Sequence, residues 1–168
     1  ERSLARRVIT IMENWGVTLD DSAGYPLANT NPAVFLRLVV EMVAADMTPI
    51  ALLSCFKHPL CAAGQPRAVF NKHAQQLEQT LLRGVRIAGG LDAMVALLKP
   101  MPELQKWVHD VAVLCGEFRA LFSKPKVSLL TLLTSHIALA ESLAATDIAD
   151  GTTRLWSGDA GNILHEFM

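Results

Sequence analysis

The chain has 168 residues, of which 51% are hydrophobic, 18% charged and 6% aromatic, which suits one ordinary globular domain. Fifteen basic and sixteen acidic side chains give a net charge of −1. This balance excludes a uniformly basic protein that coats nucleic acid, and it excludes an acidic disordered tail. Leucine and alanine are abundant, so the composition favours helices over strands and indicates a mainly α domain.

The first 30 residues predict a helix followed by a short strand. Apolar residues recur at helical spacing from Leu4 to Trp15, and Gly16 then ends the helix. Residues 17–19 form a β-like run that turn-forming residues close. A helix, a glycine and a strand in this order are typical of an α/β unit, so we expect the edge of a larger sheet. Both ends of the chain fall on helical patterns, from which we expect a piece of a longer protein.

The remaining residues predict helices separated by proline and glycine. Pro32 and Pro49 each follow a capping residue and stand at a first helical position, whereas Pro100 interrupts the pattern. Helical periodicity covers residues 32–45, 50–56, 66–82, 91–98, 103–122 and 127–145, and a last helix starts near residue 159. Residues 147–151 are expected to form a polar loop. The prediction is about eight helices, with at most one or two short strands near the N-terminus.

No motif in the chain supports catalysis. The phosphate-binding loop of ATPases and the nucleophile elbow of serine hydrolases are both absent from the sequence. The five histidines are scattered, and the close carboxylates, Asp20 with Asp21 and Asp147 with Asp150, stand where loop capping explains them. We therefore expect no catalytic residue, no metal site and no cofactor in this chain.

Cysteine usage and hydropathy bear on the compartment. Cys55, Cys61 and Cys115 lack the spacing of zinc and redox motifs, so we expect buried free thiols and a cytoplasmic location. No apolar stretch reaches the roughly 20 residues that a membrane-spanning helix needs, and we expect no membrane partner.

Trp15 and Trp107 lie on apolar helical stripes and are expected in the core. Trp156 is equally compatible with packing and with stacking on single-stranded bases.

Charge is unevenly distributed along the chain. Residues 1–56 hold four basic and six acidic groups, residues 57–126 hold ten and five, and residues 127–168 hold one and five. The central excess of +5 fits a solvated face, and it also fits a surface that contacts nucleic-acid phosphates. The candidate DNA-binding residues are Lys57, Arg67, Lys72, Arg83, Arg86, Lys106, Arg119, Lys124 and Lys126.

Short motifs also occur in an order that resembles a known family. They comprise residues 4–8, Trp15-Gly16-Val17, residues 20–24 with Pro26-Leu27, residues 35–38, Leu52-Leu53, residues 57–60 with 62–64, Leu81 with Arg83-Gly84, residues 136–144, and Leu155-Trp156 with Gly158 and Ala160-Gly161. Together these motifs resemble the double-strand break repair protein AddB, in its alphaproteobacterial form.

The resemblance implies a function in processing DNA ends for recombinational repair. It implies that residues 1–30 are the edge of a RecA-like helicase domain and that residues 31–168 are a helical insertion, as in UvrD-like helicases. The implied partners are DNA, the AddA helicase–nuclease subunit and the remainder of an AddB chain in the bacterial cytoplasm. The nuclease carboxylates and cluster cysteines of the family have no counterparts here. We therefore expect a non-catalytic region that handles DNA or acts as a scaffold, or alternatively a protein–protein interaction module without direct DNA contact.

Overall fold

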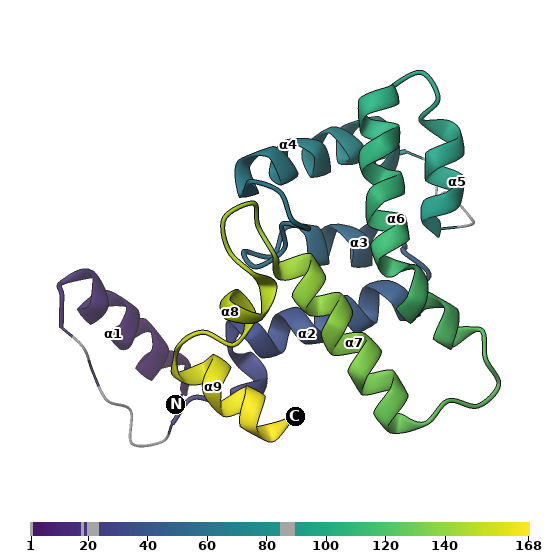
Figure 1. Cartoon of the computed structure of the whole chain (residues 1–168). Coiled ribbons are helices and arrows are strands. Elements are labelled where there is room, and N and C mark those ends of the chain that lie inside the picture. The colour runs from purple at the N-terminus through teal and green to yellow at the C-terminus, as the bar shows by residue number, and fades with distance from the viewer. Residues whose placement is uncertain (1, 18, 20–23, 85–89) are drawn as a thin grey trace.

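The computed structural model describes residues 2–17, 19, 24–84 and 90–168 (Figure 1). These residues form nine α-helices, a 3-10 helix η1 and a π-helix η2, and none of them forms a strand. The elements are α1 (Arg2–Asn14), η1 (Leu27–Asn29), α2 (Asn31–Ala44), α3 (Pro49–Phe56), α4 (Arg67–Leu77), η2 (Glu78–Leu82), α5 (Gly90–Leu97), α6 (Pro102–Phe122), α7 (Leu129–Ala144), α8 (Gly151–Leu155) and α9 (Gly158–Phe167). The prediction of a mainly α chain is confirmed for the part of the chain that the structure describes.

Helix α2 lies at the centre of the helical body. It contacts η1, α3, α6, α7 and α9, and its residues Phe35, Val39 and Met42 are completely buried. The helix begins as the sequence predicts, with Thr30 at the N-cap and proline in the first turn. Because apolar residues recur every three to four positions along α2, several helices pack against it at once.

A cluster of aromatic rings fixes α3 and α4 against α6. Phe56 of α3, Phe70 of α4 and Trp107 of α6 meet edge to face, with centroids 5.3–5.6 Å apart. Such pairs contribute roughly 0.5–1.5 kcal/mol each beyond the area that they bury. The prediction that Trp107 lies in the core is confirmed, and the cluster sets the separation between α3 and α4.

The C-terminal helices were only partly predicted. Residues 151–155 form α8, whereas the sequence pattern predicts a loop up to residue 151 and no helix immediately after it. Gly151 lets α8 approach the last turn of α7 closely, because a Cβ there would lie 1.7 Å from the carbonyl oxygen of Glu141. Trp156 is buried, and its indole N–H donates to the Glu141 carboxylate at 2.7 Å. Of its two interpretations, packing is therefore the correct one.

Buried titratable groups surround α2 and α3. The free thiols of Cys55, Cys61 and Cys115 are buried, as predicted, and burial raises the pKa of Cys115 to about 12. His58 stacks on Phe35 of α2 with centroids 5.1 Å apart. His136 of α7 places Nε2 2.9 Å from the carbonyl oxygen of Leu36. Burial lowers the pKa of both histidines, so they are neutral in the folded core at neutral pH.

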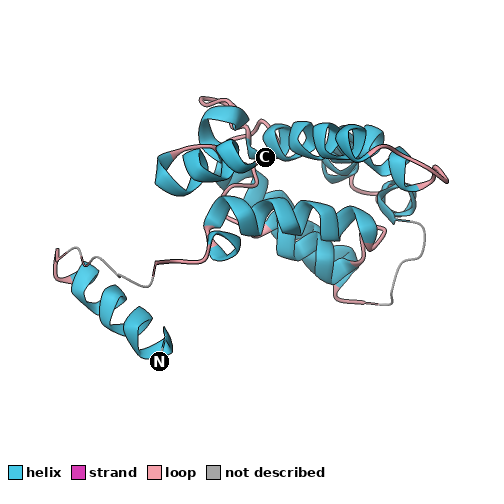
Figure 2. Ribbon diagram, turned by 90° about the horizontal axis from the view of Figure 1, so that it is seen from below, coloured by secondary structure: helices cyan, strands magenta, loops and turns pink. Residues whose placement is uncertain are grey.

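The N-terminal segment differs from its prediction in two ways. Gly16 ends α1 with a positive φ of 73°, as expected, but Val17 and Leu19 lie in no strand, and Thr18 is outside the described residues. The apolar stripe of α1 is also exposed rather than buried, and Trp15 is 78% exposed. Figure 2 shows α1 apart from the other helices. The prediction of a core position for Trp15 is wrong, because periodicity indicates an apolar face but not what covers it.

Candidate nucleic-acid interface

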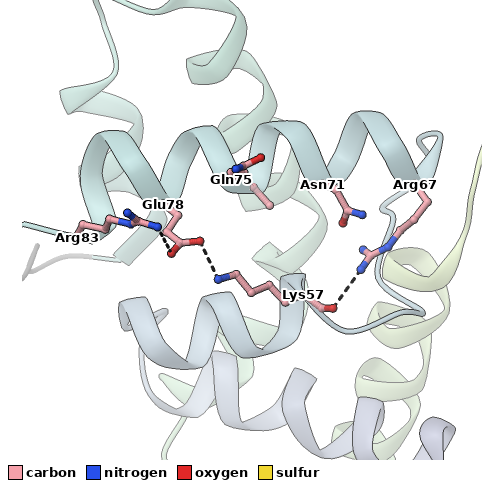
Figure 3. A pocket seen from close by; sticks show the side chains of 7 residues that line it. Lys57, Arg67, Asn71, Gln75, Glu78 and Arg83 are labelled. Carbon is pink, nitrogen blue, oxygen red and sulfur yellow. Dashed lines mark hydrogen bonds and ion pairs between the residues drawn. The ribbon is translucent and has the colours of Figure 1, made fainter.

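A polar pocket of about 430 Å³ opens between the end of α3 and one face of α4 (Figure 3). It is lined by Lys57, Arg67, Asn71, Ala74, Gln75, Glu78 and Arg83. Lys57 follows the last residue of α3, and Arg83 follows the last residue of η2. The other lining residues repeat at helical spacing along α4 and into η2. The pocket therefore brings together three of the nine candidate DNA-binding residues.

A change of helical pitch completes one end of the pocket. The sequence predicts one continuous helix over residues 66–82, but the structure ends it in the π-helix η2. The backbone N–H of Arg83 bonds the carbonyl oxygen of Glu78 at 3.2 Å, five residues back. Residues five apart face different sides of a regular α-helix, so the wider turn is what brings the two side chains together. The Arg83 guanidinium consequently lies 3.2 Å from Glu78 Oε1.

The Glu78 carboxylate lies between two cations at the pocket. Its Oε2 accepts from Lys57 Nζ at 2.8 Å, and its Oε1 accepts from Arg83 Nη2 at 3.2 Å. The hydrogen bond from Lys57, with that from Arg83, lowers the pKa of Glu78, which is therefore ionised at neutral pH. Lys57 and Arg83 remain 60% and 66% exposed, and each keeps N–H donors beyond the one used on Glu78.

Arg67 contributes to the pocket mainly by positioning its neighbour. Its guanidinium donates to the carbonyl oxygens of Phe56 at 3.1 Å, of Lys57 at 3.2 Å and of Cys61. Phe56 is the last residue of α3, and the carbonyl oxygens at the end of a helix have no partners within it. Burial lowers the pKa of Arg67, yet a guanidinium stays protonated under all ordinary conditions. Arg67 therefore holds the backbone from which the Lys57 side chain extends.

Two side-chain amides at the pocket escaped the sequence prediction. Asn71 and Gln75 lie on the face of α4 that borders the pocket, and both are exposed (Figure 3). The sequence prediction of the site follows positive charge, which an amide side chain does not carry. The polar spacing of residues 67, 71, 75 and 78 marks one face of a helix and was the available signal.

Two further candidates are partnered by carboxylates. Lys106 of α6 pairs with Asp110 one turn later, at 2.9 Å. Arg119, also on α6, lies 2.7 Å from Asp92 and 3.2 Å from Asp46. The hydrogen bond to Asp92 raises the pKa of Arg119. The charge of Arg119 is therefore offset by two carboxylates within the fold.

The remaining candidates do not join the pocket. Lys72 is exposed on α4 but is not among the lining residues. Lys124 and Lys126 are exposed in the segment between α6 and α7. Arg86 lies outside the described residues.

The described residues contain neither a metal-binding cluster nor a membrane-spanning helix. No group of three or more histidine, cysteine, aspartate or glutamate side chains there is arranged to hold a metal ion. No helix in those ranges combines the length and the apolar character required to cross a bilayer. Comparison of the chain with family models, with the sequences of curated proteins and with solved structures found no match. The functional interpretation therefore depends on the residues and geometry described above and on the ordered sequence motifs.

Proposed function

We propose that this chain is a non-catalytic, DNA-handling region of an AddB-type subunit that works with AddA on DNA double-strand breaks in the bacterial cytoplasm. In this proposal residues 1–30 belong to the edge of a RecA-like domain, and residues 31–168 form a helical insertion. The ordered motifs support the family, and the basic pocket between α3 and α4 is the observation that carries the function.

The side chains at the pocket have the chemistry that phosphate contacts require. Non-specific binding to nucleic acid depends mainly on lysine and arginine facing the phosphate backbone. Lys57 and Arg83 project cationic groups with unused donors from the pocket rim. The amides of Asn71 and Gln75 supply neutral donors of the kind that often contact phosphate and sugar. The pocket offers contacts for positioning a strand rather than for reading its sequence.

Titration of fluorescein-labelled single-stranded and forked DNA with the protein, at low and moderate salt, tests this function. We expect anisotropy to reveal binding that weakens as salt rises. R83Q should bind about fivefold more weakly, the effect of one unit charge at about 4 Å in water. K124Q removes the same charge from the segment between α6 and α7 and should change the affinity less than twofold. Absence of salt-sensitive binding at high micromolar protein would refute direct DNA handling.

The exposed face of α1 favours a second candidate, a protein–protein interaction module. Leu4, Val8, Ile11 and Trp15 form one stripe and are 44–78% exposed. Contiguous exposed apolar surface of this kind is typical of interaction sites. Two measurements test this module. Sedimentation shows whether the protein alone forms a dimer, and a capture experiment shows whether purified AddA binds it. Each is repeated with the variant V8S/I11S, which removes apolar side chains from the stripe. A monomer that captures no AddA would count against it.

A further inference from the structure

The pocket between α3 and α4 already contains an anion, the carboxylate of Glu78. We propose that Glu78 substitutes for a backbone phosphate as the partner of Lys57 and Arg83, and that DNA binds there when a phosphate takes over the hydrogen bonds from these two side chains. This inference rests on the proposed function and specifies how the same site is regulated. Glu78 is then a built-in competitor that weakens the binding of the strand.

The geometry of the ion pairs supports this exchange. The two carboxylate oxygens of Glu78 accept from different cations, Lys57 at 2.8 Å and Arg83 at 3.2 Å. A phosphodiester likewise carries a single negative charge over two non-bridging oxygens. Arginine and lysine bind both kinds of oxygen through charge-assisted hydrogen bonds. A phosphate placed between the same two cations can therefore accept the same two contacts.

The exposure of the three groups indicates which of them can move. The Lys57 and Arg83 side chains are 60% and 66% exposed, whereas that of Glu78 is 15% exposed. The two cations, rather than the carboxylate, are consequently the groups that an approaching phosphate can reach. Each needs only a change of side-chain rotamer to turn from Glu78 to a phosphate. The Lys57 backbone stays in place meanwhile, because Arg67 donates to its carbonyl oxygen at 3.2 Å.

The charges that line the pocket favour an anion even with Glu78 ionised. Lys57, Arg67 and Arg83 supply three positive charges and Glu78 supplies one negative charge. A phosphate entering the pocket is attracted by this surplus and repelled by the single carboxylate. Removal of that carboxylate charge at constant shape should therefore strengthen binding.

A purely structural role for Glu78 leads to a different expectation. Ion pairs between exposed cations and a carboxylate contribute little to folding. The π-helix η2 is also held by the backbone hydrogen bond that Arg83 donates to Glu78. E78Q should therefore fold normally, and circular dichroism with urea denaturation provides the check. If Glu78 only stabilised the fold, E78Q would weaken DNA binding or leave it unchanged.

DNA binding by E78Q is the first measurement. We expect E78Q to bind forked DNA about fivefold more tightly than the unmodified protein, as the loss of one repulsive unit charge near 4 Å in water predicts. E166Q makes the same change in net charge on α9, far from α4 in Figure 1, and should bind within twofold of the unmodified protein. The double variant E78Q/R83Q should lose most of the gain. An equal gain in E78Q and E166Q, or no gain in E78Q, would overturn the inference.

Inorganic phosphate separates failure of this inference from failure of the proposed function. In an NMR titration of E78Q with phosphate, we expect shifts confined to amides of residues 57 and 71–83, at lower concentrations than in the unmodified protein. This result supports the phosphate site even if neither protein binds DNA, in which case DNA handling alone is refuted. If the unmodified protein binds DNA while E78Q shows no preference for phosphate, the competitor role of Glu78 is refuted and the DNA function stands.

Discussion

Replacement of Gly151 by alanine tests the close packing of α8 on α7. A Cβ at this position would lie 1.7 Å from the carbonyl oxygen of Glu141 and 2.5 Å from its carbonyl carbon. Both atoms belong to the backbone of the last turn of α7, so no side-chain rotation can relieve the clash. The methyl group is accommodated only if α8 moves away from α7.

That movement breaks contacts that Arg154 and Trp156 make with the rest of the fold. Arg154 of α8 donates to the carbonyl oxygens of Leu60 at 3.0 Å and of Ala144. Trp156 donates to the Glu141 side chain at 2.7 Å. Overpacking alone costs about 1–3 kcal/mol, and a lost hydrogen bond adds about 1 kcal/mol. We therefore expect G151A to lower the free energy of unfolding by about 3 kcal/mol, which is about 6–12 °C in Tm for a chain of this size.

Gly116 provides the matched control for this substitution. It lies within α6 and is exposed, and a Cβ there would meet no atom within 4 Å other than those of its chain neighbours and of the backbone of α6 itself. Alanine is a better helix former than glycine by about 0.8–1.0 kcal/mol, so G116A should raise the midpoint of urea unfolding. Circular dichroism at 222 nm measures both variants against the unmodified protein. A G151A midpoint equal to or above that of the unmodified protein would refute the packing of α8 described here.

Three further predictions concern the core, the pocket and α1. Burial lowers the pKa of His58 and His136 below 6.5 in the folded protein. At pH values below 6.5 the unfolded chain therefore binds more protons than the folded chain does. The free energy of unfolding should be highest above about pH 6.5 and should decrease as the pH falls through the lower pKa values of the folded state. Urea midpoints from pH 8 to 5 measure this dependence, and a flat profile would contradict it. R67K should lower the free energy of unfolding by about 2 kcal/mol, because lysine cannot span the three carbonyl oxygens that Arg67 contacts; an unchanged midpoint would exclude this role. W15F should leave the midpoint within experimental error while W107F lowers it, because Trp15 is exposed and Trp107 is buried; a large loss in W15F would place α1 against the body.

The sequence predicted those helices whose ends carry their own signals. Thr30 and Thr48 precede the proline-containing first turns of α2 and α3, and both helices begin where expected. Helix α8 escaped prediction because its five residues are too few to establish a period. It is held instead by the close approach to Glu141 that Gly151 allows and by the hydrogen bond from Arg154 to Leu60, which lies 94 residues away in the chain.

Predicting the site required information that net charge does not contain. Arg119 is offset by Asp46 and Asp92, which lie 73 and 27 residues away in the sequence. Arg67 bonds backbone carbonyl oxygens, which no composition reveals. Conversely, Arg83 meets Glu78 only because the helix widens into a π-turn. A count of basic residues could identify the region, whereas tertiary pairing decided which cations gather at one pocket.

These pairings predict how DNA binding should depend on salt. The slope of the logarithm of the binding constant against that of salt is about −0.7 for each phosphate neutralised on a single strand. If all nine candidate residues contacted phosphates, the slope would be about −6. Contacts from Lys57 and Arg83 alone give about −1.4. We expect the shallow slope, because Arg119 is paired with two carboxylates within the fold and Arg67 donates to backbone carbonyl oxygens. A slope steeper than about −4 would mean that the pocket is a minor part of the surface that contacts DNA.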